Sequence, residues 1–188
     1  MKFIKDEEFI RGNCPMTKEE VRILSLSKLE LEENSRVLDI GAGTGSVTIQ
    51  MSKICNSGEV VAVEMDEEAI EVIKKNIEKF EANNVTLVES EAYEAVNNIK
   101  GEFDGIFIGG SGGNIDKIIY EYGKMLKPQG KMVLNFITIS NLYKAMEALK
   151  ENGYKVEVSQ IAVARGRGNS CMLMANNPIF IICGEKIS

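Results

Sequence analysis

Short apolar runs alternate with amphipathic stretches along most of the chain. Five runs have the composition of strands that are buried on both faces, as the strands of a parallel sheet are. They are Arg36–Ile40, Glu59–Val63, Val85–Val88, Phe103–Ile108 and Lys131–Phe136. Apolar residues at helical spacing predict helices at Ser46–Ile54, Asp66–Phe80, Ile115–Leu126 and Ser140–Asn152. This alternation predicts a Rossmann-like, doubly wound α/β sheet with right-handed crossovers.

The end of the chain has a different pattern. Two strand-like runs, Lys155–Ala164 and Leu173–Cys183, have no helix between them, and a turn-rich segment, Arg165–Ser170, connects them. That arrangement predicts a hairpin, so an antiparallel edge is added to the parallel sheet. We therefore expect about seven strands, mostly parallel, with a C-terminal antiparallel hairpin.

The residues before Ser35 have the pattern of a cap on the sheet. Thr17 and Glu20 have the spacing of a capping box, which predicts the start of a helix that continues to about Leu29. No linker or internal repeat divides the chain, and 188 residues suit one domain. The expected organisation is a single domain over residues 1–188, with a cap at 1–34, a core at 35–152 and the hairpin region at 153–188.

Composition removes several classes of function. The chain contains no histidine, which excludes Ser-His and Cys-His triads and removes the most common metal ligand. Its four cysteines lack the spacing of a zinc site, so we expect no metal centre. The net charge of −6 argues against broad nucleic-acid binding, and no nucleic-acid partner is expected. The chain has no apolar run of about 18 residues and no signal peptide, which favours a cytoplasmic protein without a membrane partner.

The segment Asp39-Ile40-Gly41-Ala42-Gly43-Thr44-Gly45 follows one predicted strand and begins one predicted helix. Glycines allow a sharp turn and a close approach to a ligand, and a helix start presents free N–H groups. A dinucleotide fingerprint, G-x-G-x-x-G, needs its third glycine one residue later, where Ser46 stands. The loop instead resembles the S-adenosylmethionine (SAM) loop of class I methyltransferases. The resemblance implies a SAM-binding role for Asp39, Gly41, Ala42, Gly43, Thr44 and Gly45.

Two further acids follow later strands. Glu64 lies 19 positions after Gly45 (64 − 45), where an acid can accept hydrogen bonds from ribose hydroxyls. Asp66 is the more suitable helix cap, which leaves Glu64 for the ribose. After the third strand, the same resemblance implies that Glu91 and the backbone of Ala92 contact the adenine, although the family more often has Asp where Glu91 stands.

The fourth predicted strand runs into a glycine-rich segment, Gly109-Gly110-Ser111-Gly112-Gly113. Ligands of such sheets bind at the carboxyl ends of the strands, so this segment is expected to face the transferred methyl group and the substrate. Many amino-methylating relatives have an Asn/Asp-Pro-Pro-aromatic clamp here, which this chain lacks. A floor of glycines suits a bulky substrate instead.

A set of motifs resembles one family over nearly the whole chain: the cobalt-precorrin carbon-15 methyltransferases (decarboxylating), or precorrin decarboxylases, of anaerobic cobalamin biosynthesis. The motifs are Asp6–Arg11, Pro15–Arg22, Asp39–Gly45, Phe107–Gly113, Ala162–Arg167 and Asn177–Phe180. The strings Pro-Met-Thr-Lys and Gly-Gly-Ser-Gly-Gly are the specific ones. In that family the threonine of the first string helps to bind SAM, which implies the same role for Thr17.

The resemblance also implies a substrate and a reaction. The substrate would be a corrinoid, a cobalt-precorrin with many carboxylates, which an acidic protein must bind through a local basic cluster. Candidates for that cluster are Arg165, Arg167, Lys18 and Arg22. The implied reaction is SAM-dependent methylation of a bridge carbon with decarboxylation of an acetate side chain, for which the sequence names no catalytic acid or base. A homo-oligomer is implied too, with a tetramer as one option, and the edge hairpin offers a surface for it.

Two other interpretations are left open by the residues. A methyltransferase that acts on protein isoaspartyl groups or on tRNA has a similar core, although the tRNA interpretation predicts a basic face. A non-catalytic SAM-binding subunit would bind the cofactor without turning over a corrinoid. Labelled methyl in protein, RNA or corrinoid would separate these possibilities.

Overall fold

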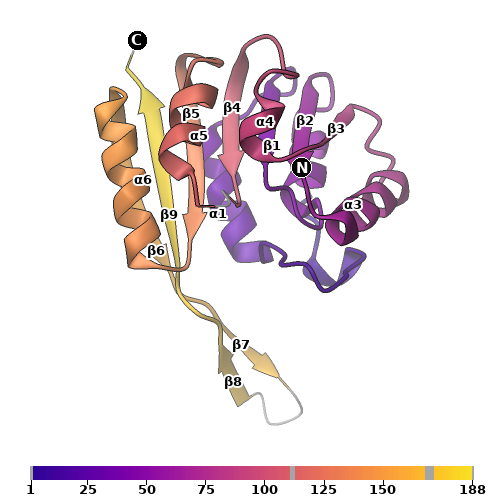
Figure 1. Cartoon of the computed structure of the whole chain (residues 1–188). Coiled ribbons are helices and arrows are strands. Elements are labelled where there is room, and N and C mark those ends of the chain that lie inside the picture. Colours follow the sequence, from indigo (N-terminus) through magenta and orange to yellow (C-terminus); the bar gives the residue numbers. More distant parts are fainter. Residues whose placement is uncertain (1, 111–112, 168–171, 188) are drawn as a thin grey trace.

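The structure, a computed structural model, describes residues 2–110, 113–167 and 172–187. Within these ranges the centre is a seven-stranded sheet in the order β3-β2-β1-β4-β5-β9-β6 (Figure 1). Strands β1 to β5 pair in parallel, and β9 is antiparallel to both of its neighbours. The predicted α/β class and the mostly parallel sheet are confirmed. The strands are β1 (Arg36–Ile40), β2 (Glu59–Glu64), β3 (Val85–Glu89), β4 (Phe103–Ile108), β5 (Leu126–Phe136), β6 (Tyr154–Ile161) and β9 (Ile179–Lys186).

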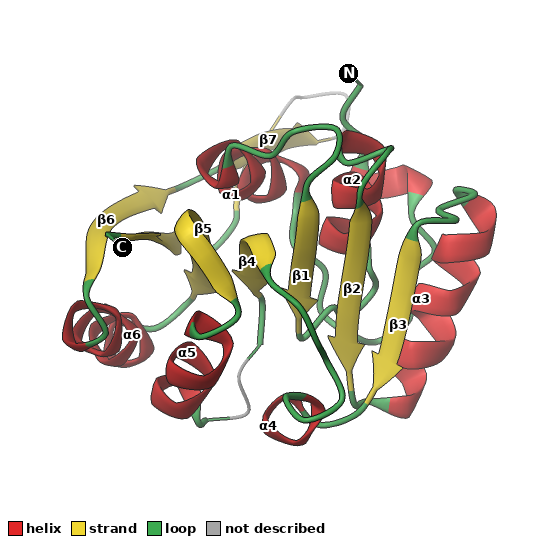
Figure 2. Ribbon diagram, turned by 90° about the horizontal axis from the view of Figure 1, so that it is seen from above, coloured by secondary structure: helices red, strands yellow, loops and turns green. Residues whose placement is uncertain are grey.

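Helices cover both faces of the sheet (Figure 2). One face carries α1 (Glu19–Leu29), α2 (Ser46–Ile54) and α3 (Glu67–Lys79), and the other carries α4 (Ala92–Ala95), α5 (Ile115–Gly123) and α6 (Ile139–Glu151). Successive residues of a strand point to opposite faces, so one strand supplies both cores. In β1, for example, Val37 packs in the cluster under α1 and α2, and Leu38 packs in the cluster under α5 and α6. The strands are therefore apolar on both faces, as their sequence pattern predicts.

Local sequence explains some of the helix ends. Asp66 caps α3 as predicted, because its side chain accepts a 2.9 Å hydrogen bond from the Ala69 N–H. Helix α5 ends at Gly123, three residues before the predicted end at Leu126, since Leu126 already pairs with Phe103 in the sheet. A short 3-10 helix, η1 (Asp6–Glu8), lies near the N-terminus.

The capping box predicted for Thr17 and Glu20 is wrong. Helix α1 begins at Glu19, its N-cap is Lys18, and no side chain caps it by a hydrogen bond. The Glu20 carboxylate accepts two hydrogen bonds from the guanidinium of Arg165 instead. Arg165 is 145 residues away in sequence, so spacing within the helix gives no sign of this competing partner.

The predicted hairpin is confirmed, but each arm is divided in two. Strands β6 and β9 pair up to Ile161 and Ile179, and the arms continue as a separate two-stranded sheet of β7 (Ala164–Arg167) and β8 (Met172–Ala175). Pro178 lies in the break and has no N–H to give to the ladder. Figure 1 shows the β7–β8 pair projecting beyond the main sheet, from the edge at which β5 also ends. Along the described parts of the chain, none of the helices is long and apolar enough to cross a membrane.

Candidate functional site

A cavity of about 300 Å³ lies at the carboxyl ends of the parallel strands. The strand order reverses between β1 and β4: β2 and β3 follow on one side of β1, and β4 and β5 follow on the other. Such a reversal leaves a crevice for a ligand at the carboxyl ends of the two strands. The lining comes from the N-terminal segment, the end of β2, the loops after β1, β2, β3 and β4, and the start of α4. The lining residues are Pro15, Thr17, Gly41, Ala42, Gly43, Val63, Glu64, Met65, Ser90, Glu91, Ala92, Gly109 and Gly110.

Glycine backbones from two loops meet in this cavity. Gly41 has a φ of +71°, and a Cβ atom on it would lie 2.7 Å from the backbone nitrogen of Gly110. A Cβ atom on Gly43 would lie 3.0 Å from the Pro15 carbonyl oxygen. Only glycine fits such positions without moving the neighbouring backbone. The loop after β1 therefore touches both the loop after β4 and the N-terminal segment.

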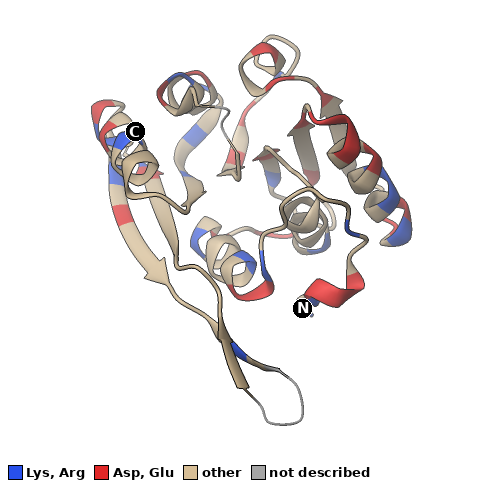
Figure 3. Cartoon of the chain, turned by 60° about the horizontal axis from the view of Figure 1, so that its bottom comes forward, with Lys and Arg blue, Asp and Glu red and all other residues tan. Residues whose placement is uncertain are grey.

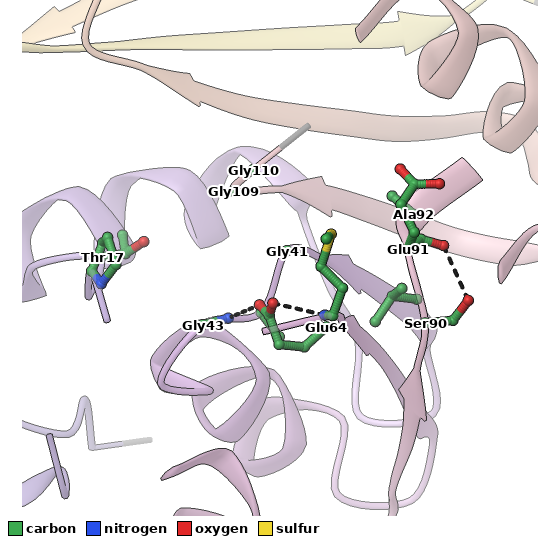
Figure 4. A pocket seen from close by; sticks show the side chains of 13 residues that line it. Thr17, Gly41, Gly43, Glu64, Ser90, Glu91, Ala92, Gly109 and Gly110 are labelled. Atoms are coloured by element: carbon green, nitrogen blue, oxygen red, sulfur yellow. Dashed lines mark hydrogen bonds between the residues drawn. The ribbon is translucent and has the colours of Figure 1, made fainter. Parts of the chain in front are cut away.

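Glu64 ends β2 and is held by backbone donors. Its Oε2 accepts a 2.7 Å hydrogen bond from the Gly43 N–H, and its Oε1 accepts from the N–H groups of Met65 and Asp66 at 2.8 and 2.9 Å. A carboxylate has about four acceptor positions, so about one is left for a ligand. Figure 4 shows Glu64 in the middle of the cavity, with Thr17 on one side and Ser90, Glu91 and Ala92 on the other. The side chain is positioned to accept a hydrogen bond from a hydroxyl in the cavity.

Glu91 lines the cavity but has a structural task as well. Its Oε2 accepts from the N–H groups of Tyr93 at 2.7 Å and Glu94 at 3.1 Å, which makes Glu91 the N-cap of α4. A carboxylate at a helix start is stabilised by the free N–H groups there. The helix cap and the cavity wall are thus formed by one residue, and Ala92 follows directly as a backbone wall.

Thr17 forms the opposite wall. Its carbonyl oxygen accepts a 2.8 Å hydrogen bond from Arg22 Nη1 and a 3.4 Å hydrogen bond from Ser46 Oγ. Arg22 belongs to α1 and Ser46 begins α2. Two helices therefore fix the backbone of the wall residue, while its side chain stays available to the cavity.

Asp39 lies behind the loop and does not line the cavity. The residue is fully buried, Thr48 Oγ1 donates a hydrogen bond to its Oδ2, and its Oδ1 has no hydrogen-bond partner among the residues that the structure describes. Burial raises the pKa of the Asp39 carboxyl to about 7. Thr44 and Gly45 also stay outside the lining; Gly45 is the N-cap of α2, with a φ of +76°.

The predicted substrate residues are found in several places. Gly109 and Gly110 line the cavity, whereas Gly113 does not. Ser111 and Gly112 fall outside the described residues. Arg165 lies on β7 and bonds to Glu20. Arg167 is also on β7, but its side chain is outside the described part of the structure.

Four lining residues were missed by sequence reasoning: Pro15, Val63, Met65 and Ser90. Pro15 belongs to the Pro-Met-Thr-Lys string, so its motif was a usable signal. Met65 follows Glu64 directly and exposes 62% of its surface, which is unusual for a large apolar residue at a strand end. An apolar side chain beside an acid at this point of the sheet would suit a ligand with both a flat ring and hydroxyl groups.

The residues present fit an adenosyl group that carries an amino acid. Glu64 has about one acceptor position left for a hydroxyl, and Met65 and Ala92 offer apolar contact. The glycine pairs at Gly41–Gly43 and Gly109–Gly110 leave room beside the backbone for the rest of such a molecule. The cavity thus offers an adenosyl group a hydrogen-bond acceptor, apolar contacts and space along the glycine backbones.

Comparison with known proteins identifies the family. The family model described as "Precorrin methyltransferase domain" matches residues 8–186. A protein of Sulfurisphaera tokodaii named "Probable cobalt-precorrin-6B C(15)-methyltransferase (decarboxylating)" is 43% identical over 187 residues, covering 97% of both chains. A Salmonella typhimurium protein named "Cobalt-precorrin-6B C(15)-methyltransferase (decarboxylating)" is 38% identical, covering 97% of this chain and 96% of its own.

A solved structure agrees with these relatives. The crystal structure of a precorrin-6y C5,15-methyltransferase from Geobacter metallireducens has a TM-score of 0.93 and 41% identity, and the match covers 98% of this chain and 96% of that one. Sequence and fold thus agree over almost the full length of each partner. The chain belongs to the precorrin methyltransferase family.

Proposed function

We propose that this protein transfers a methyl group from SAM to a bridge carbon of a cobalt-precorrin and catalyses the loss of carbon dioxide from an acetate side chain. The observation that carries the proposal is the cavity in which glycine backbones of two strand ends meet next to Glu64. The names of the relatives, which match over nearly the whole chain, support the corrinoid substrate and the decarboxylation.

The cavity residues would divide the binding of SAM among them. Glu64 would accept a ribose hydroxyl, the backbone at Ala92 with Glu91 would border the adenine, and Thr17 with the loop Gly41–Gly43 would hold the amino-acid end. Asp39, Thr44 and Gly45 would act by supporting that loop from behind. SAM, when bound, supplies an electrophilic methyl group.

The protein's part in the chemistry would be mainly alignment. The chain has no histidine to serve as a base at neutral pH. An electron-rich conjugated carbon needs no strong base to attack a methyl group, so holding the two reactants in line can supply most of the rate. Gly109 and Gly110 leave space for a large ring system next to the cavity.

A large substrate would also meet apolar and basic side chains at this edge of the sheet. Ile137 and Ile139 follow the carboxyl end of β5, and each exposes 71% of its surface. Gly109–Gly113, Arg165 and Arg167 are the proposed contacts, the two arginines for substrate carboxylates. A combination of exposed apolar groups and cationic groups matches the chemistry of a polycarboxylate macrocycle.

The test is a reaction with SAM and a cobalt-precorrin, followed by mass spectrometry of the corrinoid. The expected product has gained one methyl group and lost one carbon dioxide. Methyl gain without loss of carbon dioxide would remove the decarboxylating half of the proposal. Labelled methyl that appears in protein or RNA, and not in corrinoid, would favour the isoaspartyl or tRNA alternative.

We further propose that the protein forms a homo-oligomer through the β7–β8 hairpin. Met172, Leu173 and Met174 of β8 expose 62%, 71% and 45% of their surfaces, which is typical of a surface that another chain covers.

In analytical ultracentrifugation, Leu173→Glu should reduce the mass of the sedimenting species. Ile187→Glu, at a residue exposed to 65% near the C-terminus, is the matched control and should leave the mass unchanged. Equal masses for both variants would contradict the hairpin interface.

A further inference from the structure

A buried ionic cluster lies between the hairpin and the cavity. Its centre is Arg22 on α1, whose side chain is fully buried. The Arg22 guanidinium donates to the carbonyl oxygens of Ile4 and Thr17, contacts Asp6 Oδ1 at 3.3 Å, and lies 4.9 Å from the ring centre of Phe9. Burial lowers the pKa of Arg22, and the Asp6 charge opposes that shift. A buried cation held by so many partners fixes the positions of those partners relative to one another.

Arg165 extends this cluster to the hairpin. Its Nε and Nη2 donate to the two carboxylate oxygens of Glu20, at 2.8 and 2.5 Å. Its Nη1 lies 3.4 Å from Asp6 Oδ2, within ion-pair distance but without the geometry of a hydrogen bond. The hydrogen bonds from Arg165 lower the pKa of Glu20, as expected for a carboxylate with a bidentate arginine. Figure 3 shows the acidic η1 segment in red near the N-terminus, and its Asp6 is the residue that both arginines share.

The cluster leads directly to the wall of the cavity. Glu20 lies in the first turn of α1, and the segment that enters this turn contains Pro15 and Thr17, both of which line the cavity. Arg22 holds the Thr17 carbonyl from the other side at 2.8 Å. A Cβ atom on Gly43 would lie 3.0 Å from the Pro15 carbonyl oxygen, so the two backbones are in close contact. A shift of the Pro15–Thr17 segment therefore changes the width of the cavity over the glycine loop.

We propose that Arg165 is a positioning residue for the cofactor cavity: through Glu20, Asp6 and Arg22 it holds the Pro15–Thr17 wall in place from the hairpin. This inference rests on the proposed binding of SAM in that cavity. It gives the hairpin a role in cofactor binding in addition to its proposed contacts with substrate carboxylates and with a second copy of the chain. Binding of a substrate or of a second copy of the chain to the hairpin would then change the affinity for the cofactor.

The experiment measures the affinity for S-adenosylhomocysteine by calorimetry, with no corrinoid present. Arg165→Gln and Glu20→Gln should each weaken binding by about three- to thirtyfold, the range expected when a coupling contact is removed. The double variant should bind about as weakly as Arg165→Gln, because that single variant already loses the contact with Glu20. Arg36→Gln is the matched control, since Arg36 also forms a partly buried ion pair, with Glu59 at 2.6 Å, and lies at the start of β1, at the opposite end of the strand from the lining residues.

A second readout separates positioning from loss of stability. With corrinoid present at saturation, the KM for SAM should rise in Glu20→Gln while kcat at saturating SAM changes little, because Glu20 is not among the proposed substrate contacts. Arg165→Lys keeps the charge and can make one of the two bonds to Glu20, so its affinity should lie between those of the wild type and Arg165→Gln. If Arg165→Gln does not fold, Arg165→Lys and Glu20→Gln carry the test.

The two proposals fail in different ways. A wild-type protein that does not bind S-adenosylhomocysteine contradicts the proposed function itself. A wild-type protein that binds it, together with folded Arg165→Gln and Glu20→Gln variants that bind within twofold of the wild type, overturns the role of Arg165. Additive losses in the double variant would also overturn it, because the two residues would then act independently.

Discussion

Glu64 shows how a single residue joins the loop and the cavity. It fixes the loop through the Gly43 N–H and offers the remaining acceptor position to the cavity. We predict that Glu64→Gln weakens S-adenosylhomocysteine binding at least about tenfold, because hydrogen bonds to a charged group contribute about 1.5–3 kcal/mol. Calorimetry measures this directly. Glu89→Gln is the control: Glu89 pairs with Glu64 in register on the next strand but faces Lys74 and does not line the cavity. Equal affinities for the two variants would remove Glu64 from the site.

Asp39 predicts a pH dependence of stability. Its pKa is about 7 in the folded protein and 3.8 as a free side chain, so the folded state holds the proton more tightly. Stability should therefore fall as the pH rises from about 4 to about 7, and this contribution should be constant above that range. The shift of about three pH units corresponds to at most roughly 4 kcal/mol.

The variant Asp39→Asn removes this titration and provides the comparison. Urea unfolding at pH 5 and at pH 8 gives the free energy of unfolding of both proteins. The stability of Asp39→Asn relative to the wild type should increase between the two pH values. If the difference in unfolding free energy between the two proteins is the same at both pH values, Asp39 is ionised at both, or its carboxyl is accessible to water in solution.

At the scale of elements, the sequence predicts what is local and misses what is decided by distant partners. The strands β1, β2 and β4 and the cap of α3 follow from apolar runs and from Asp66. The start of α1 does not, because Arg165 competes for Glu20 across the fold. In the site, the motif residues Gly41, Gly43 and Glu64 were found, but Ser90 was not, since a single serine after a strand has no distinguishing pattern.

The contact between the loops after β1 and β4 gives a prediction at the same scale. Gly41→Ala should lower the melting temperature and abolish S-adenosylhomocysteine binding, because its Cβ would lie 2.7 Å from the Gly110 backbone. Gly153→Ala is the matched control: its φ of +77° carries a similar backbone cost of about 1–2 kcal/mol, but nothing lies within 4 Å of the added atom. In their effect on stability, the two variants thus differ by the close approach. Equal losses of stability and unchanged binding in Gly41→Ala would show that the loops can separate without consequence.

At the scale of the whole molecule, the seven-stranded sheet and the hairpin are separable. The ladder of β6 and β9 ends at the pair Ile161 and Ile179, whose facing backbones a two-residue turn can join. Among the residues whose side chains the structure describes, the cores under both faces of the sheet contain none from β7 or β8. The structure therefore predicts that residues 162–178 can be replaced by Asn-Gly with the main sheet preserved.

Such a protein would test what the hairpin does for the rest of the molecule. Far-UV circular dichroism and a cooperative thermal transition should show that it folds. Its affinity for S-adenosylhomocysteine should fall by about the same factor as in Arg165→Gln, because the deletion removes the same guanidinium from Glu20 and Asp6. The number of chains in the sedimenting species should also fall, since Met172–Met174 are gone. A folded deletion protein with wild-type affinity and the wild-type number of chains per assembly would show that the hairpin serves neither the cavity nor assembly, and would leave the corrinoid as its remaining proposed partner.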